Sequence, residues 1–164
     1  MTTHHATIHW SRAEDAPFID RRYSRAHRWS FDGGAVVPGS SSPHVVKVPL
    51  SDPSAVDPEE AYVAALASCH MLWFLDFASR KGYVVDDYRD EATATMGEDA
   101  EGRTFVARVL LDPAIAFSDA KRPDDAAVSA LHEEAHHHCF LANSVKTEIV
   151  HRGTWTHDAA PAIV

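Results

Sequence analysis

The sequence has few cysteines, few basic residues and no long uninterrupted apolar run. It contains two cysteines in 164 residues and no Cys-x-x-Cys motif, which argues against a disulfide scaffold. Fifteen basic residues stand against 24 acidic ones, a formal net charge of −9 with neutral histidines. We therefore expect neither nucleic acid nor an anionic membrane as a partner. The longest apolar stretch, from Tyr62 to Leu75, is interrupted by Ser68 and His70 and is shorter than the roughly 20 residues of a membrane span.

Signals for export are also missing from the start of the chain. Residues 1–5 form neither a cationic region nor an apolar one, so we expect a soluble, cytoplasmic protein. The 45% share of hydrophobic residues is enough for a real core. We expect a single domain over residues 1–164, with its core at about 6–157 and a loose C-terminal tail at 158–164.

The clearest structural signal is the start of a long helix after residue 56. Asp57 is a good N-cap, Pro58 suits the first helical position, and Glu60 stands three residues after the cap, as in a capping box. No further glycine or proline follows until Gly82, which predicts a helix to about residue 81. Residues 64–69 are apolar or small on all sides, so we expect this helix to be wrapped by sheet or covered by a partner subunit.

In the sequence, strands are expected before and after this helix, with a second helix near the end of the chain. Alternating or β-branched patterns predict strands at 6–10, 27–31, 44–50, 84–96, 103–117 and 147–156, the fifth of them bent near Asp112-Pro113. Asp124 caps a predicted helix from 126 to about 139, whose core-facing stripe includes Cys139. Strands and helices in this order predict an α+β fold.

One motif on the second helix is typical of zinc hydrolases. His132-Glu133-Glu134-Ala135-His136 matches the HExxH pattern, in which two histidines bind zinc and the first glutamate activates water. In one common extension of this motif a third histidine binds the zinc, but Ala142 occupies that position here. We therefore favour solvent-facing histidines without a metal, and keep a metal-dependent hydrolase as an alternative.

The two cysteines are the stronger candidates for chemistry. Cys69 lies in the buried middle of the first predicted helix, and Cys139 lies on the inward stripe of the second. Two inert core thiols remain one interpretation. Helices packed face to face would instead bring the thiols within reach of each other, and a nucleophilic thiolate needs a fixed cation nearby. The arginine-rich segment 21–28 could supply that cation.

At this point the sequence resembles the OsmC/Ohr family. The resemblance rests on Val56-Asp57-Pro58-Glu59-Glu60 leading into Ala64-Ala65-Leu66-Ala67-Ser68-Cys69-His70, and on the segment 139–146 around the second cysteine. It implies an intertwined homodimer whose long central helices pack between antiparallel β-sheets. It also implies a thiol peroxidase without cofactor or metal, which reduces small apolar organic hydroperoxides and in some members hydrogen peroxide.

The resemblance also implies roles for four residues. Cys69 matches the peroxidatic cysteine, Cys139 the resolving cysteine, and Glu59 the carboxylate that holds the catalytic arginine. For the arginine we choose Arg25, with Arg28 second. Glu59 has an alternative interpretation as a carboxylate that stabilises the positive end of the helix dipole.

The resemblance leaves the reductant and the activity level open. In the family the disulfide is reduced by a dithiol, carried by a lipoylated or a thioredoxin-like protein. An OsmC-like binding or redox-sensing protein with little peroxidase activity is the alternative function. Many relatives have proline after the second cysteine, whereas this chain has Phe140. Without proline the helix need not break there, which would hold Cys139 more rigidly.

Overall fold

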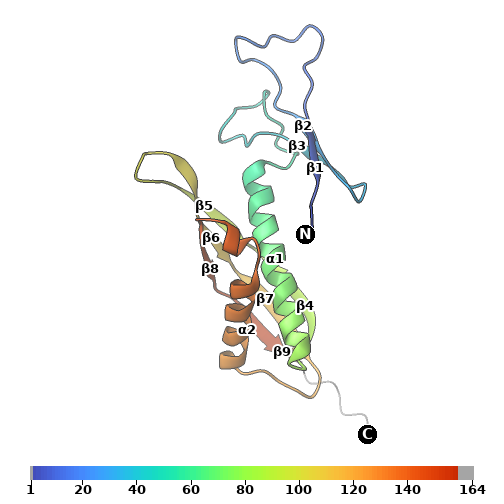
Figure 1. The fold of residues 1–164 in the computed structure, drawn as a ribbon, viewed down its shortest axis with the longest axis vertical. Helices are drawn as coiled ribbons and strands as arrows, with labels where there is room; N and C mark the ends of the chain where they lie inside the picture. Colours follow the sequence, from blue (N-terminus) through green and yellow to red (C-terminus); the bar gives the residue numbers. More distant parts are fainter. Residues whose placement is uncertain (1, 159–164) are drawn as a thin grey trace. The chain divides into compact units, whose positions relative to one another are not determined.

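Three short antiparallel strands form the sheet of the first 62 residues. They are β1 (Ala6–His9), β2 (His27–Phe31) and β3 (Val36–Gly39), paired in the order β1-β2-β3 (Figure 1). The computed structural model describes residues 2–158, so the predicted tail at 158–164 lies outside them except for Asp158. The chain divides after Tyr62 into two compact units, and each is described by itself.

The sequence-based prediction for this first sheet was wrong at its third strand. Residues 44–50 form turns instead of a strand, in which the backbone N–H groups of Val45 and Val46 donate to Ser42 O. Pro49 lacks the N–H that a strand would use, and this favours the irregular path. The third strand lies earlier, at 36–39, after a tight turn in which Gly34 adopts a positive φ of 86°.

The long helix α1 (Pro58–Arg80) begins and ends where the sequence predicts. Glu60 N–H donates to Asp57 Oδ1 at 2.8 Å, and Asp57 N–H donates to Glu60 Oε2 at 3.0 Å, which completes a capping box. Gly82 follows the last turn with a φ of 76°, a conformation that glycine adopts without strain.

One face of α1 is buried within the chain and another is exposed. The buried side chains are Leu66, His70, Phe74, Phe77 and Ala78. Ala65, Ser68 and Leu72 are exposed, so within this chain the sheets cover only one face of the helix. Cover by a partner subunit stays a prediction. By length and composition α1 would also qualify as a membrane span, a property that core helices of soluble proteins share.

The second unit contains two three-stranded sheets of mixed direction. One has the order β4-β7-β9, formed by β4 (Val84–Asp90), β7 (Pro113–Ser118) and β9 (Thr154–His157). The other has the order β5-β6-β8, formed by β5 (Thr93–Glu98), β6 (Thr104–Leu111) and β8 (Glu148–His151). Each of the three long strands predicted from sequence in this unit is therefore a pair of strands, one in each sheet. Of the three breaks, the bend at Asp112-Pro113 was predicted and the other two were not, because alternation continues through a bend.

The break between β8 and β9 depends on a close backbone approach. Gly153 lies beside Pro113, and a Cβ atom at Gly153 would come within 2.5 Å of Pro113 O. Because β7 and β9 pair in parallel from Ala114 and Thr154 onward, this contact lies where their pairing begins. Glycine lets the two backbones meet there.

Helix α2 (Asp125–His138) completes the core. Ala127 N–H donates to the predicted N-cap, Asp124 Oδ1, at 2.7 Å. Within the second unit, α1 and α2 lie side by side against the strands (Figure 1). The core cluster comprises Phe74, Phe77 and Ala78 of α1, Ile115 and Phe117 of β7, and Val128, Leu131 and Ala135 of α2. The observed architecture is the α+β class that the sequence predicts.

Candidate functional site

The structure brings the two cysteines together in the second unit. Cys69 is half-buried near the middle of α1, and Cys139 follows the last turn of α2 with 1% of its surface exposed. Both thiols are free, and they lie close enough for the Cys69 thiol to act on the pKa of the Cys139 thiol. The residues are 70 positions apart in sequence, and the packing of α1 against α2 makes them neighbours.

The surroundings of the two thiols differ. Burial, and to a smaller extent the neighbouring Cys69 thiol, raise the pKa of the Cys139 thiol to about 11. The N–H of Ala142 lies 3.4 Å from Cys139 Sγ and acts in the opposite direction. Cys139 is therefore a protonated thiol at neutral pH, whereas Cys69 has access to solvent and lines a pocket.

Helix α2 ends immediately before Cys139, although proline does not follow this cysteine. The N–H of Cys139 makes the last helical bond, to Ala135 O at 2.9 Å, and its own backbone is extended, with ψ at 111°. The chain then turns into a short 3₁₀ helix, η1 (Ala142–Ser144). Asn143 N–H donates to Cys139 O at 3.0 Å, and its Nδ2 donates to His137 O at 2.9 Å. Local hydrogen bonds thus end the helix without a proline after Cys139.

A pocket of about 380 Å³ adjoins Cys69. Its lining residues are Cys69, Leu72, Trp73, Asp76, Arg80 and Phe140. Most of this lining is apolar, and at its polar side Arg80 pairs with Asp76 at 2.8 Å. Trp73, one helical turn after Cys69, lines this pocket, whereas Phe74 is fully buried in the core.

Arg25 and Glu59 line a common pocket in the first unit. This pocket, about 460 Å³ in volume, also contains Trp10, Phe18 and Tyr23 in its walls. The Arg25 guanidinium lies over the Tyr23 ring at 3.9 Å and donates to the carbonyl groups of Arg21 and Tyr23. In the described part of the chain, no ion pair joins Arg25 to Glu59.

The second candidate arginine has different surroundings. Arg28 is exposed on β2 and does not contribute to the lining of this pocket, whereas Arg25 is half-buried in it. The structure therefore places Arg25, and not Arg28, in one pocket with Glu59.

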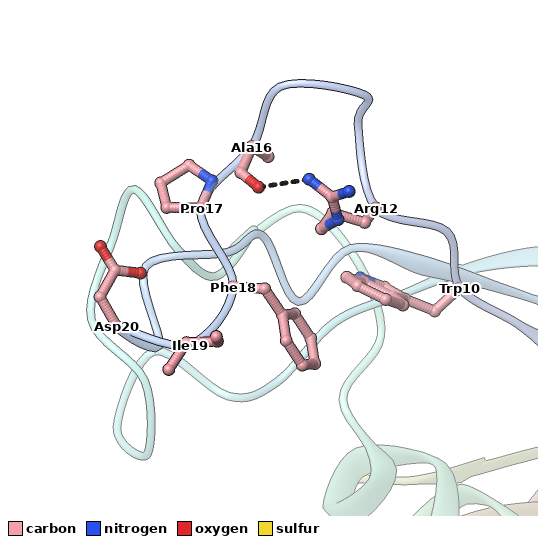
Figure 2. A pocket seen from close by; sticks show the side chains of 7 residues that line it. All are labelled: Trp10, Arg12, Ala16, Pro17, Phe18, Ile19 and Asp20. Carbon is pink, nitrogen blue, oxygen red and sulfur yellow. Dashed lines mark hydrogen bonds between the residues drawn. The ribbon is translucent and has the colours of Figure 1, made fainter.

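Sequence reasoning missed the aromatic cluster of the first unit. Ring centroids of Phe18 and Tyr23 are 4.7 Å apart, and Trp10 lies 5.4 Å from Tyr23 and 5.8 Å from Phe18. Figure 2 shows Trp10 and Phe18 in the wall of a second pocket of about 700 Å³, where Arg12 donates to Ala16 O at 2.7 Å. The residues follow no regular spacing, so no sequence pattern could have found this cluster.

The HExxH histidines take different positions. His132 is buried, and its Nδ1 lies at hydrogen-bond distance, 3.0 Å, from Nε2 of His70. The ring of His151 stacks on that of His132 with centroids 4.9 Å apart, whereas His136 is exposed. The expectation that both motif histidines face solvent is therefore wrong for His132, which adjoins the core stripe of α2. Within residues 2–158, no group of three or more His, Cys, Asp or Glu side chains is arranged to hold a metal ion.

Burial sets the protonation state of this histidine cluster. Loss of hydration lowers the pKa of His70 to about 3 and that of His132 to about 4, and the neighbouring imidazoles act in the same direction. The pKa of His151 is lowered too, chiefly by burial. The three rings are therefore neutral at neutral pH, and the two buried ones, His70 and His132, adjoin the core, where the ring of His132 packs against Phe74 with centroids 4.6 Å apart.

The structure therefore has an α+β fold in which two packed helices bring two free thiols close together, as expected for a protein that uses a pair of cysteines. The family model described as OsmC-like protein matches residues 51–152, and the chain belongs to this family. An OsmC-like protein of unknown function from Vibrio cholerae is 47% identical, with a TM-score of 0.91 over 93% of this chain and 99% of that one. Among curated proteins, none matches the sequence.

Two structures of lower identity share the fold. An organic hydroperoxide resistance protein from Elizabethkingia anophelis is 14% identical, with a TM-score of 0.65 over 96% of this chain and 98% of that one. The organic hydroperoxide resistance protein OhrB of Bacillus subtilis is 15% identical, with a TM-score of 0.61 over 94% and 98%.

Proposed function

We propose that this protein reduces organic hydroperoxides with its two cysteines, and that hydrogen peroxide is a further substrate. The observation that carries the proposal is the proximity of the half-buried Cys69 thiol to the buried Cys139 thiol, beside an apolar pocket. Membership in the OsmC-like family supports a redox role, and two relatives of the same fold are named organic hydroperoxide resistance proteins.

The proposed reaction assigns a different role to each thiol. The Cys69 thiolate attacks the distal oxygen of the hydroperoxide, an S–O bond forms, the O–O bond breaks, and the alkoxide leaves as an alcohol after taking up a proton. The resulting Cys69 sulfenic acid condenses with the Cys139 thiol, which forms the disulfide and releases water. Cys139 suits the second role, because its raised pKa keeps it protonated and unreactive toward the peroxide itself.

We assign Arg25 as the cation that stabilises the Cys69 thiolate and Glu59 as the carboxylate that orients Arg25. Support comes from the pocket that the two side chains share and from the charge that arginine keeps in a partly buried site. The test compares Arg25→Ala with the exposed control Arg28→Ala. We expect Arg25→Ala to slow oxidation of Cys69 about a hundredfold, the order of effect of a lost electrostatic contact in a transition state. An equal rate in the two variants would remove Arg25 from the mechanism.

The catalytic cycle also needs partners. We propose a homodimer, because one face of α1 carries small or apolar side chains, those of Ala65, Ser68 and Leu72, that are exposed in the single chain. A dithiol on a lipoylated or thioredoxin-like protein would reduce the Cys69–Cys139 disulfide by exchange and become a disulfide itself. Two free thiols suit a reducing compartment, and we therefore propose a cytoplasmic location.

The decisive experiment is a thiol count and an intact mass of reduced protein, before and after one equivalent of cumene hydroperoxide. The proposal predicts the loss of both thiols and of two hydrogen atoms in the wild type. In Cys139→Ser a dimedone-trapped sulfenic acid should appear on Cys69, and Cys69→Ser should leave the peroxide intact. Wild-type protein that keeps both thiols while peroxide persists would refute the peroxidase and favour a binding or sensing role.

A further inference from the structure

A buried hydrogen bond between two histidines joins α1 to α2 near the thiol pair. Nε2 of His70 and Nδ1 of His132 are 3.0 Å apart, and both side chains are buried. Their lowered pKa values keep both rings neutral at neutral pH, so one nitrogen of the pair carries a proton and the other accepts it. The proposed reaction uses neither residue. Packing alone does not require a polar pair here, since two apolar side chains of similar shape can replace such a bond at little cost.

Each histidine has a fixed relation to one of the two cysteines. His70 directly follows Cys69 in α1, so the two side chains leave that helix about 100° apart. His132 and Cys139 lie on the same side of α2, separated by about two turns, or about 10 Å along the helix axis. Adjacent side chains of α1 therefore face α2 at two separate points. Two such points determine how α1 is rotated about its own axis, whereas a single point would leave that rotation free.

The other contacts around this bond are less directional. The ring of Phe74 packs against that of His132 with centroids 4.6 Å apart, and the rings of Phe77 and His138 are 5.0 Å apart. The ring of His151 stacks on His132 at 4.9 Å. Such contacts tolerate sliding and rotation, because burial of apolar surface has no preferred direction. A hydrogen bond weakens steeply when its angle changes, and in a buried site water does not replace it.

Formation of a disulfide demands precise placement of both cysteines. The Cβ atoms of a disulfide lie roughly 3.5–4.5 Å apart, so a displacement of about 1 Å is enough to take the pair out of range. Cys139 has 1% of its surface exposed and is held at the end of α2, which leaves it little freedom to follow a displaced Cys69. Fixing the rotation of α1 therefore raises the effective concentration of one thiol at the other.

We propose that His70 and His132 are positioning residues, whose hydrogen bond holds Cys69 in the orientation from which it forms a disulfide with Cys139. Neither histidine contacts the peroxide. The inference rests on the proposed use of the two cysteines as a pair, and it adds the contact that sets the stability of their disulfide.

The test is the equilibrium of the full-length protein with reduced and oxidised glutathione at pH 7, in which free thiols are counted by mass after alkylation. Oxidised glutathione takes up the hydrogen atoms of both thiols and becomes two molecules of reduced glutathione, while the Cys69–Cys139 disulfide forms. Neither a peroxide nor the physiological reductant is needed.

The variants separate the hydrogen bond from packing. The double variant His70→Leu/His132→Leu removes the bond without leaving an unpaired polar group, so its core should stay packed. In His70→Gln the side-chain amide reaches the position of the imidazole Nε2 and keeps the bond. His137→Leu makes the same change at an exposed histidine of α2 and is the control.

For the double variant we expect a melting temperature close to that of the wild type and an equilibrium constant for disulfide formation about tenfold lower. This fall corresponds to a reduction potential about 30 mV less negative. His70→Gln and His137→Leu should keep the wild-type constant within about twofold. If the double variant does not fold, His70→Asn, whose amide is too short for the bond, should show the same tenfold fall against His70→Gln.

Two results would overturn the positioning role while the cysteine pair stands. One is an unchanged constant in the folded variant that lacks the bond. The other is an equal fall in His70→Gln, which would show that loss of the ring matters and loss of the bond does not. Wild-type protein that forms no Cys69–Cys139 disulfide at any ratio of the two glutathiones would refute the proposed function, and this inference with it.

Discussion

Mild acid should destabilise the second unit through the buried pair His70 and His132. Their exposed fractions are 2% and 5%, and burial lowers their pKa values to about 3 and about 4, from 6.5 for a histidine side chain in water. Because the folded pKa values are depressed, the unfolded chain binds more protons as the pH drops below 6.5. This stabilising contribution is therefore complete above pH 6.5 and declines progressively toward pH 4.

The expected size of the effect follows from these pKa values. Between pH 7 and pH 5, proton linkage lowers the free energy of unfolding by about 2 kcal/mol for each of the two histidines. Their combined loss of about 4 kcal/mol is a large part of the roughly 5–15 kcal/mol that stabilises a typical domain. His151, with His136 and Glu133 near it, adds a smaller contribution of the same sign.

Urea unfolding followed by far-UV circular dichroism at pH 7 and pH 5 measures this loss. In His132→Asn, an amide replaces the titrating ring beside His70, and about half of the pH dependence should disappear. His137→Gln, which changes an exposed histidine of the same helix, is the control and should keep the full dependence. Equal stability of the wild type at the two pH values, or the same slope in His132→Asn, would refute the reasoning.

Two further predictions concern the backbone. Gly153→Ala should destabilise the fold by about 2 kcal/mol or more, because its Cβ would come within 2.5 Å of Pro113 O. The control is Gly33→Ala. No atom lies within 4 Å of the Cβ added there, so the melting temperature should stay nearly unchanged. Similar melting temperatures for the two variants would show that the β7–β9 junction relaxes freely. Asp57→Ala removes the N-cap of α1 and should cost about 1 kcal/mol in urea unfolding, as should Asp124→Ala for α2. A loss below a few tenths of a kcal/mol in either would mean that solvent replaces that cap.

Both helices were predictable because their signals are local. A cap and the N–H group it accepts from lie three residues apart, as Asp57 and Glu60 do, so sequence spacing alone specifies the bond. The core stripe of α2 was equally readable, since Leu131, Ala135 and Cys139 recur at helical spacing and are all buried. The α+β class followed from the order of such elements.

The strands were harder to predict for a physical reason. Alternation of side chains marks which face of a strand is buried, but it continues unchanged when the chain passes from one sheet to another. The region 147–156 therefore looked like one strand, although Gly153 separates β8 from β9. Nothing in the local pattern shows that a proline from another strand will approach this glycine.

The chemistry divides in the same way. The sequence alone identifies Cys69 and Cys139 as the residues to examine, because their types and helical positions are local properties. Tertiary packing decided that the two thiols are neighbours, that His70 meets His132, 62 residues away in the sequence, and that Phe140 faces Trp73 at the pocket. The periodicity of apolar residues indicates which side of a helix is buried. Which residues cover that side depends on how elements distant in sequence pack. Their packing sets the burial of a side chain, its pKa and its access to solvent.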